Sequence, residues 1–350
     1  MNLKFLNNFS LIIVLSILIS KTNLDVPVYI QGYISLGYDS NPLRLSYDEI
    51  QYSEHSDLLL NDADGISSNT TSIYGKISYN PKLINNRKTR LSLSFKRNIF
   101  FQHENKNNKS INFNINQSIG GYKKIYFNYY LMPDFYLREY RDIDEIINND
   151  FTYTDIYDSL QSAYFSIEKI KLGYEFPVDM LLSKIKLEIN QEKQYYDPIF
   201  TEFDLDIVGA SFSYSNSNFS MFFNYSVADN STYLDGLFST NYMDRSYEQY
   251  QYKLTYDKQL ENNISFGIIA NIYNRLYSSN IYNDALHRTR THIDSNVSLW
   301  YKFFISELKN KIQFTYRMRS TDSIFDWVED LKSFKRYYLT YTVYLDKIEL

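Results

Sequence analysis

The sequence predicts an all-β protein, a transmembrane antiparallel up-and-down β-barrel of about 14 strands. Three observations predict this class. Apolar and polar residues alternate along most of the chain, many alternating runs are longer than globular strands, and long and short connections follow one another in turn. Outer-membrane barrels combine these features, because alternate side chains face lipid and the short turns lie on one side of the membrane.

Composition supports strands and excludes several other classes. The chain has 36 Tyr and 24 Phe but only 10 Gly and 6 Pro, and both aromatic residues favour strands. Its net charge of −5 gives no basic footprint for a nucleic acid. Cysteine is absent, which excludes disulfide frameworks and thiolate metal sites. We expect no cofactor.

The N-terminus predicts a secretory signal peptide over residues 1–24. Lys4 precedes the apolar run Leu11–Ile19, which is shorter than the about 20 residues of a spanning helix. Cleavage is expected between about residues 20 and 26. The barrel then occupies residues 25–350. The alternative interpretation of the apolar run is an uncleaved anchor.

Fourteen runs carry the alternation in chain order. The next-to-last run illustrates the two faces, with Ile312, Phe314 and Tyr316 on one and Gln313 and Arg317 on the other. We expect the apolar faces to contact outer-membrane lipid and the polar faces to line the lumen. The predicted strands are 28–39, 70–79, 89–101, 109–119, 122–133, 158–177, 183–196, 203–215, 218–229, 246–258, 263–277, 288–303, 306–320 and 333–346.

The connections predict how the barrel lies in the membrane. The longest connections, 40–69 and 134–157, follow odd-numbered strands, and the two-residue connections 120–121 and 216–217 follow even-numbered ones. Bacterial barrels have long outer loops and short periplasmic turns. We therefore expect the long connections outside the cell and both termini in the periplasm.

Two of the predicted strands have an irregular pattern. The run 158–177 is interpreted as one long strand, although a break near Glu168 and Lys169 would give fifteen strands and spoil the alternation of loop lengths. In the run 203–215 the apolar face switches near Gly209. This switch predicts a β-bulge there.

The stretch "GYDSNP", Gly37–Pro42, ends the first strand abruptly. Asp39 and Asn41 favour turns, and Pro42 has no N–H for a strand ladder. This stretch resembles the first-strand ending of several Gram-negative outer-membrane barrels, including the barrel portion of surface lipoprotein assembly modifiers. The resemblance implies a fourteen-stranded barrel in the outer membrane.

Charged residues gather on the polar faces of the last strands. Such a set predicts either a charged wall that selects anions or a salt-bridged, water-facing lining without selectivity. Acidic residues on the strand 183–196 are expected to face it across the pore. The candidate pore-lining residues are Arg288, Arg290, His292, Asp294, Lys309, Lys311, Arg317, Arg319, Glu188 and Glu192.

The leading hypothesis for function is a pore for passive passage of small polar solutes. The alternative is a plugged structural, surface-interaction or assembly barrel without conductance. An enzyme is not expected, because Ser295 points away from the face that His292 and Asp294 share. The acidic connection 134–157 is interpreted as a solvated loop, with a Ca²⁺ or Mg²⁺ site as its alternative. The sequence identifies no protein partner.

Overall fold

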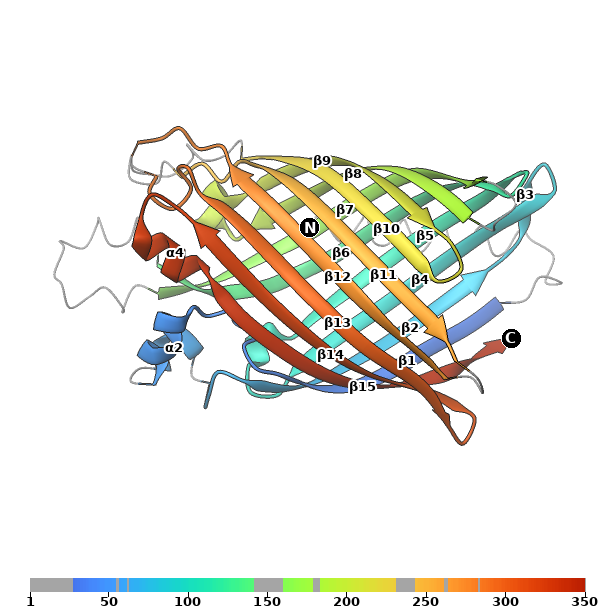
Figure 1. The fold of residues 1–350 in the computed structure, drawn as a ribbon, viewed down its shortest axis with the longest axis horizontal. Helices are drawn as coiled ribbons and strands as arrows, with labels where there is room; N and C mark the ends of the chain where they lie inside the picture. The colour runs from blue at the N-terminus through green and yellow to red at the C-terminus, as the bar shows by residue number, and fades with distance from the viewer. Residues whose placement is uncertain are drawn as a thin grey trace, which may run out of the picture.

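The computed structural model describes residues 28–54, 57–61, 63–141, 160–178, 183–230, 243–260, 264–282 and 284–349. Within these ranges fourteen antiparallel strands form one closed barrel, and the short strand β3 (Lys82–Ile84) decorates the turn before β4 (Figure 1). The barrel strands are β1 (Val28–Asp39), β2 (Ser68–Tyr79), β4 (Arg87–Phe100), β5 (Asn108–Gly120), β6 (Lys123–Arg141), β7 (Leu160–Val178), β8 (Ser183–Tyr196), β9 (Leu205–Ser215), β10 (Phe219–Asp229), β11 (Tyr247–Gln259), β12 (Ser265–Tyr277), β13 (Thr291–Ile305), β14 (Leu308–Asp322) and β15 (Phe334–Glu349).

The barrel closes between its first and last strands. Tyr33 of β1 lies opposite Tyr74 of β2 on one side and Tyr344 of β15 on the other. The other barrel strands pair with their neighbours in the chain, with β2 pairing directly with β4. No barrel strand therefore keeps an unpaired edge, as a spanning sheet requires. The predicted up-and-down barrel of fourteen strands is confirmed.

Most predicted strands agree with the observed bounds to within a few residues. The predicted single strand over 158–177 is confirmed, because β7 keeps its register through Glu168 and Lys169 on both sides. Two bounds were wrong. β6 runs on to Arg141, through the first part of the predicted loop. β13 begins at Thr291, later than predicted, because the left-handed backbone of Thr289 (φ 54°) belongs to the turn before this strand.

The predicted bulge at Gly209 is wrong. Gly209 pairs with Asn190 and Ser226 in an unbroken register. The apolar face changes for a different reason. Leu205 and Ile207 point inward and are buried with Tyr247 at the end of the barrel, while Phe212 points outward like the other lipid-facing residues.

The two ends of the barrel differ. One end, called here the loop end, carries α2 (Tyr47–Ser53), η1 (Asp57–Leu60), η2 (Glu104–Lys106), η3 (Pro198–Phe203) and α4 (Asp326–Lys332) (Figure 1). The other, the turn end, has tight connections such as 121–122 and 306–307. The predicted alternation of loop lengths is confirmed, and its assignment to outside and periplasm stays a prediction. None of the described helices is both long and apolar enough to cross a membrane.

The outer face of the barrel is an apolar band. Large hydrophobic side chains are exposed on strands all around it, for example Leu36 at 56% and Ile189 at 62%. Such exposure is stable only against lipid, and closed barrels with this exterior span outer membranes. The chain is therefore an outer-membrane barrel. The band includes Ile34, Ile73, Ile77, Phe95, Ile125, Leu172, Phe212, Met221, Phe223, Leu254, Ile268, Ile272, Val297, Leu299, Ile312, Phe314 and Leu339.

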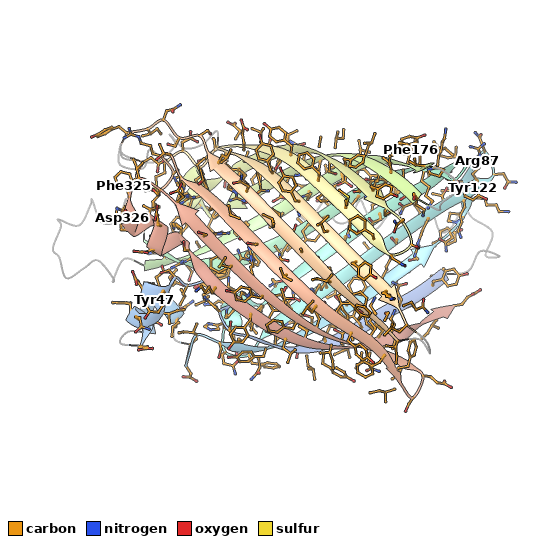
Figure 2. All side chains as sticks on the ribbon, viewed as in Figure 1. Tyr47, Arg87, Tyr122, Phe176, Phe325 and Asp326 are labelled. Carbon is orange, nitrogen blue, oxygen red and sulfur yellow. The ribbon has the colours of Figure 1, made fainter. Side chains whose placement is uncertain are left out.

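Aromatic side chains mark both rims of the band. Tyr122 and Phe176 lie at the turn end, and Tyr47 and Phe325 lie at the loop end (Figure 2). Tyr122 is 87% exposed and Tyr47 is 74% exposed. Amphipathic rings favour the level of the lipid headgroups, so these positions suit the two membrane interfaces.

The inner face carries polar groups and a few large rings that lie flat on glycine. The ring of Tyr126 covers Gly173, where an added Cβ would lie 2.1 Å from it, and Trp300 covers Gly267 with a distance of 2.2 Å. Only glycine permits such close approach of a ring to the backbone. Segment 1–27, which includes the predicted signal peptide, lies outside the described residues.

Candidate functional site in the barrel interior

The wall formed by β13 and β14 carries an arginine pair that shares one carboxylate. Asp294 lies opposite Arg319 in the strand register and diagonal to Arg317. Arg317 donates to both oxygens of Asp294 at 2.8 and 2.6 Å, and Arg319 donates to Oδ2 at 3.1 and 2.9 Å. One negative charge thus neutralises one of two positive charges, and the pair keeps a surplus of one.

Two further arginines lie against tyrosine rings beside this pair. The guanidinium carbon of Arg275 is 3.9 Å from the ring centroid of Tyr247, and that of Arg290 is 3.8 Å from Tyr277. Arg275 also donates to Gln249 at 2.8 and 3.1 Å. Among the described residues neither arginine has a carboxylate partner. Aromatic faces, the Gln249 amide and the Tyr277 hydroxyl, which accepts from Arg275 at 3.3 Å, therefore hold these charges in place.

Arg290 is positioned by a loop that is folded around a buried carboxylate. Asp284 accepts from the backbone N–H of Asp244 at 2.9 Å and from Ser279 Oγ at 3.0 Å, and its Oδ1 lies 2.9 Å from His287 Nδ1. Burial lowers the pKa of His287 to about 3, helped by the nearby charge of Arg290 and against the pull of Asp284. A neutral histidine therefore holds Asp284 within the connection 278–290, and Asp284 ties this connection to the segment 243–246.

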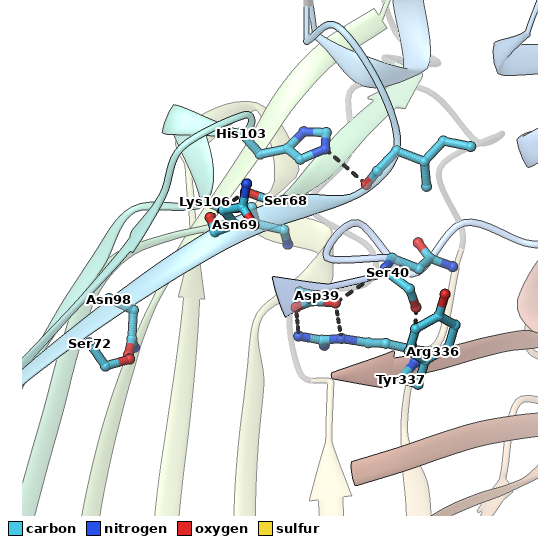
Figure 3. A network of polar contacts seen from close by, with 12 residues as sticks. Asp39, Ser40, Ser68, Asn69, Ser72, Asn98, His103, Lys106, Arg336 and Tyr337 are labelled. Carbon is cyan, nitrogen blue, oxygen red and sulfur yellow. Dashed lines mark hydrogen bonds and ion pairs between the residues drawn. The ribbon is translucent and has the colours of Figure 1, made fainter. Parts of the chain in front are cut away.

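The connection 40–67 between β1 and β2, called here loop one, is fastened to the wall at its start. Asp39 forms an ion pair with Arg336, and Ser40 bonds to the backbone of Tyr337 (Figure 3). The side chain of Asn41 donates to the carbonyls of Leu45 at 2.8 Å and Lys335 at 3.2 Å, and accepts from the Leu45 N–H at 2.8 Å. The "DSN" of the quoted stretch thus anchors loop one to β15.

Loop one then continues into a capped helix that is tied to β6. Ser46 and Glu49 form a capping box at the start of α2, an arrangement that satisfies two free helix N–H groups reciprocally. The same Glu49 forms an ion pair with Arg138 of β6. Glu49 therefore joins the cap of the helix to the extended end of that strand.

Loop one also has an apolar core of its own. Leu43, Leu45 and Leu60 pack with Ala63 and with Tyr136 of β6. Tyr136 belongs to the part of β6 that extends beyond the predicted strand, so this cluster covers part of the loop end of the barrel.

A buried lysine from the connection 101–107 fastens the same extension. Lys106 donates its ammonium protons to the carbonyls of Tyr136 at 3.0 Å and Leu137 at 2.7 Å. Burial, together with nearby Arg44, lowers the pKa of Lys106. The carbonyls take the place of the missing counter-ion, so this lysine has a structural role.

Loop one presents one arginine to the barrel interior. Arg44 has a left-handed backbone (φ 59°), and its Nε is buried without a hydrogen-bond partner. The nearby cationic side chains are Arg317, Arg336 and Arg319. Burial and these like charges lower the pKa of Arg44 well below its usual value. A buried cation among cations is unfavourable by itself.

Arg44, Arg275, Arg290 and the arginine pair with Asp294 line one cavity of about 490 Å³ inside the loop end of the barrel. Eight of its lining side chains are cationic and two are carboxylates. The cations are Arg44, Lys169, Arg245, Arg275, Arg290, Arg317, Arg319 and Lys332, and the carboxylates are Glu192 and Asp294. A second cavity of about 420 Å³ lies along β1, β2, β14 and β15, with Lys96, Lys311 and Arg336 in its lining.

The predicted acidic wall exists but is paired. Lys169 binds Glu192 at 2.7 Å, and Lys171 and Lys186 bind Glu188 at 3.1 and 2.9 Å. Tyr126 adds a hydrogen bond of 2.6 Å to Glu188. Three lysines thus bind the two carboxylates, so this wall carries no uncompensated negative charge. Glu192 shares the larger cavity with the basic cluster, the name used here for the six arginines in its lining.

The predicted candidates do not form one site. Arg290, His292, Asp294, Arg317, Arg319 and Glu192 line the larger cavity, and Lys311 lines the second. Lys309 lies near the turn end beside the ring of Tyr344. Arg288 is outside the wall, in the turn before β13, where it lies over the exposed ring of Tyr282. The prediction that β13 carries Arg288 was therefore wrong.

Arg44, Arg245 and Arg275 belong to the basic cluster but are not among the pore-lining candidates predicted from the sequence. Arg44 and Arg245 belong to connections whose path the alternation does not predict. One signal was present, since Leu43 and Leu45 flank Arg44 with apolar side chains in an otherwise polar connection. Arg275 stands on the polar face of the predicted strand 263–277, where the alternation does predict a lumen-facing side chain.

The described residues hold no cluster of three or more potential metal ligands. Of the acidic connection 134–157, residues 142–157 lie outside the described part of the chain. His292 and Asp294 share a face, as predicted, but Asp294 is bonded to arginines, and His292 Nδ1 is buried without a partner. No nucleophile, base and orienting group are combined here.

The chain is similar to solved structures at low sequence identity. No family model and no curated protein matches the sequence. Three similar solved structures are OccAB3 of Acinetobacter baumannii (TM-score 0.45, 9% identity, 93% of this chain and 100% of that chain), OccK1 (OpdK) of Pseudomonas aeruginosa (0.40, 8%, 91% and 98%) and OprD of Pseudomonas aeruginosa (0.38, 7%, 93% and 96%). At these scores and identities the likeness carries no information about a substrate.

Proposed function

We propose that the chain is an outer-membrane pore through which small polar solutes pass passively, anions in preference to cations. The observation that carries this proposal is the larger lumenal cavity with its eight cationic and two anionic lining side chains. Barrels of eight strands are filled by side chains, while sixteen to eighteen strands leave an aqueous channel. A fourteen-stranded barrel with two lumenal cavities suits small solutes.

The anion preference follows from how the charges are compensated. The carboxylates on β8 are bound by lysines, and Asp294 neutralises one of two arginines. Arg44, Arg275 and Arg290 have no carboxylate partner among the described residues. Uncompensated charge on one wall of a narrow polar passage raises the local concentration of counter-ions. The passage therefore attracts anions.

One observation favours the alternative of a plugged structural barrel. Loop one forms a buried apolar core with β6 at the loop end, and ion pairs and the Asn41 side chain hold it in place. A well-anchored segment across the mouth reduces or closes the passage. In that case the basic cluster anchors loop one and carries no flux.

Proteoliposome swelling tests the proposal. Liposomes that contain the purified chain are placed in isotonic arabinose, in succinate and in the cation lysine. The proposal predicts swelling in arabinose above empty liposomes, and faster uptake of succinate than of lysine. Swelling no faster than that of empty liposomes would instead establish the plugged barrel.

A further inference from the structure

The larger cavity contains polar atoms that nothing in the described protein satisfies. The Nε of Arg44, the Nε of Arg290 and the Nδ1 of His292 are buried without hydrogen-bond partners. All three residues line the same cavity, and the residues Arg290 and His292 are each only 4% exposed. Unsatisfied buried polar groups are rare in native proteins, and three of them on residues that line one cavity point to a ligand.

The chemistry of these atoms specifies the ligand. His292 has Arg275, Arg290, Arg317 and Arg319 as charged neighbours. Arg44 approaches the same wall from loop one, with Arg317 and Arg319 as neighbours. Guanidinium groups are donors only, and their planar forks match the oxygens of carboxylate and phosphate groups. The two unsatisfied guanidinium Nε atoms are therefore donors, and the surplus positive charge around them favours an anionic acceptor.

The size of the cavity and the residues that line it narrow the class of ligand further. The cavity of about 490 Å³ falls within the range of small-molecule sites, about 300–1,000 Å³. Tyr247 and Tyr277 already hold Arg275 and Arg290 from behind, which fixes the guanidinium planes before a ligand arrives. Such preorganised donors lose little freedom on binding.

We propose that the basic cavity is a saturable binding site for a small organic oxyanion, held between Arg44 of loop one, Arg290 of the connection 278–290 and His292 of β13. The proposal deepens the pore function and rests on it for its physiological meaning. Because the ligand joins loop one to the wall, an occupied site also stabilises loop one in its inward position. The shared chemistry is the oxyanion, and carboxylate and phosphate are its two sources.

Equilibrium titration of the refolded full chain in detergent micelles tests the proposal without any flux. The probes are succinate, inorganic phosphate and the uncharged sugar arabinose, measured by calorimetry. We expect saturable binding of one or both anions and none of arabinose. Binding by succinate alone identifies a carboxylate site, and binding by phosphate alone identifies a phosphate site.

Variants locate the site. Arg44→Gln and Arg290→Gln should each weaken anion binding by roughly tenfold or more, because each removes charge-assisted hydrogen bonds. Lys311→Gln removes the same charge from the second cavity and should change affinity by less than about twofold. Arg290→Lys keeps the charge without the planar fork, and should bind less tightly than wild type but more tightly than Arg290→Gln.

Several results overturn the proposal. One is a folded wild-type barrel that binds neither anion, and another is equal affinity of wild type, Arg44→Gln and Arg290→Gln. A third is equal weakening by Lys311→Gln, which would show a diffuse lumenal field with no defined site. A barrel that binds the anion but does not conduct would support the binding site and contradict the pore function. Failure of the one proposal is therefore distinguishable from failure of the other.

Discussion

At the scale of single residues, the interior is governed by which charges are compensated. Arg317 and Arg319 stood out in the sequence as a basic pair, but both are bound to Asp294. Replacing both arginines by glutamate would place three carboxylates together. A change in ion selectivity in such a variant would then be confounded with misfolding. Arg275 and Arg290 rest on tyrosine rings. Their neutral substitution changes the lumenal charge more cleanly.

Asn41 is the residue on which the position of loop one depends most. Its side chain satisfies both backbone groups of Leu45 and one carbonyl of β15. Asn41→Ala leaves these groups unpaired, at a cost of roughly 1–3 kcal/mol to the local structure. We expect the amide of Leu45 to exchange with solvent at least about tenfold faster. Asn69→Ala, on β2, is the matched control, and equal exchange in both variants would contradict the role of Asn41.

His287 makes the connection 278–290 sensitive to acid. Its folded pKa of about 3 lies below the ordinary value of about 6.5. The opened loop therefore binds a proton below about pH 6.5 that the closed loop does not, so closure is fully stable above this pH and weakens as pH falls toward 4. The protection of the Arg288 amide, its hydrogen exchange measured relative to the intrinsic rate at each pH, should fall over this window in wild type. His287→Asn, which does not titrate, should remove the dependence, and a flat wild-type profile would refute it.

At the scale of elements, alternation predicted the strands because lipid and lumen impose opposite requirements on successive side chains. The predictions failed where that requirement stops. Leu205 and Ile207 break the pattern at the loop end because they point inward and pack against Ala228 and Tyr247 of neighbouring strands. β6 continues to Arg141 because loop one and Lys106 pack on its extension. The path of loop one depends on long-range contacts such as Asn41 with Lys335, which no local pattern encodes.

β14 offers a direct test of facing. Phe314 is 44% exposed on the outer face, while Gln313 lines the second lumenal cavity. Phe314→Arg should destabilise the barrel by roughly 2–4 kcal/mol if it lies near the midplane of the bilayer. Gln313→Arg, its neighbour, should cost far less. Reversible unfolding from lipid vesicles measures both, and equal costs would invalidate the facing assigned to this strand.

The glycine under Tyr126 gives a second test within one element. In Gly173→Ala the new methyl group would overlap the tyrosine ring, and Tyr126 would leave its 2.6 Å bond to Glu188. Overpacking of this kind costs roughly 1–3 kcal/mol. Gly75→Ala on β2 is the control, because no atom lies within 4 Å of its added Cβ. Denaturant midpoints that fall equally in the two variants would contradict this packing.

At the scale of the whole molecule, closure, apolar exterior and polar interior were all predictable from period, strand length and loop length. The basic cavity was only partly predictable. Its β13 and β14 members stand on one face of the sequence pattern, whereas Arg44 and Arg245 reach it from connections. The anion-attracting passage at the loop end is therefore a property of the assembled barrel.

The measurement that tests this claim most directly is the reversal potential of single channels under a steep potassium chloride gradient. The account predicts open channels with an anion-selective reversal potential in wild type, shifted toward zero in Arg275→Gln/Arg290→Gln. Arg97→Gln, on the exposed face of β4, should leave it unchanged. Cation selectivity, a double variant identical to wild type, or a reconstituted barrel that never conducts would contradict the account.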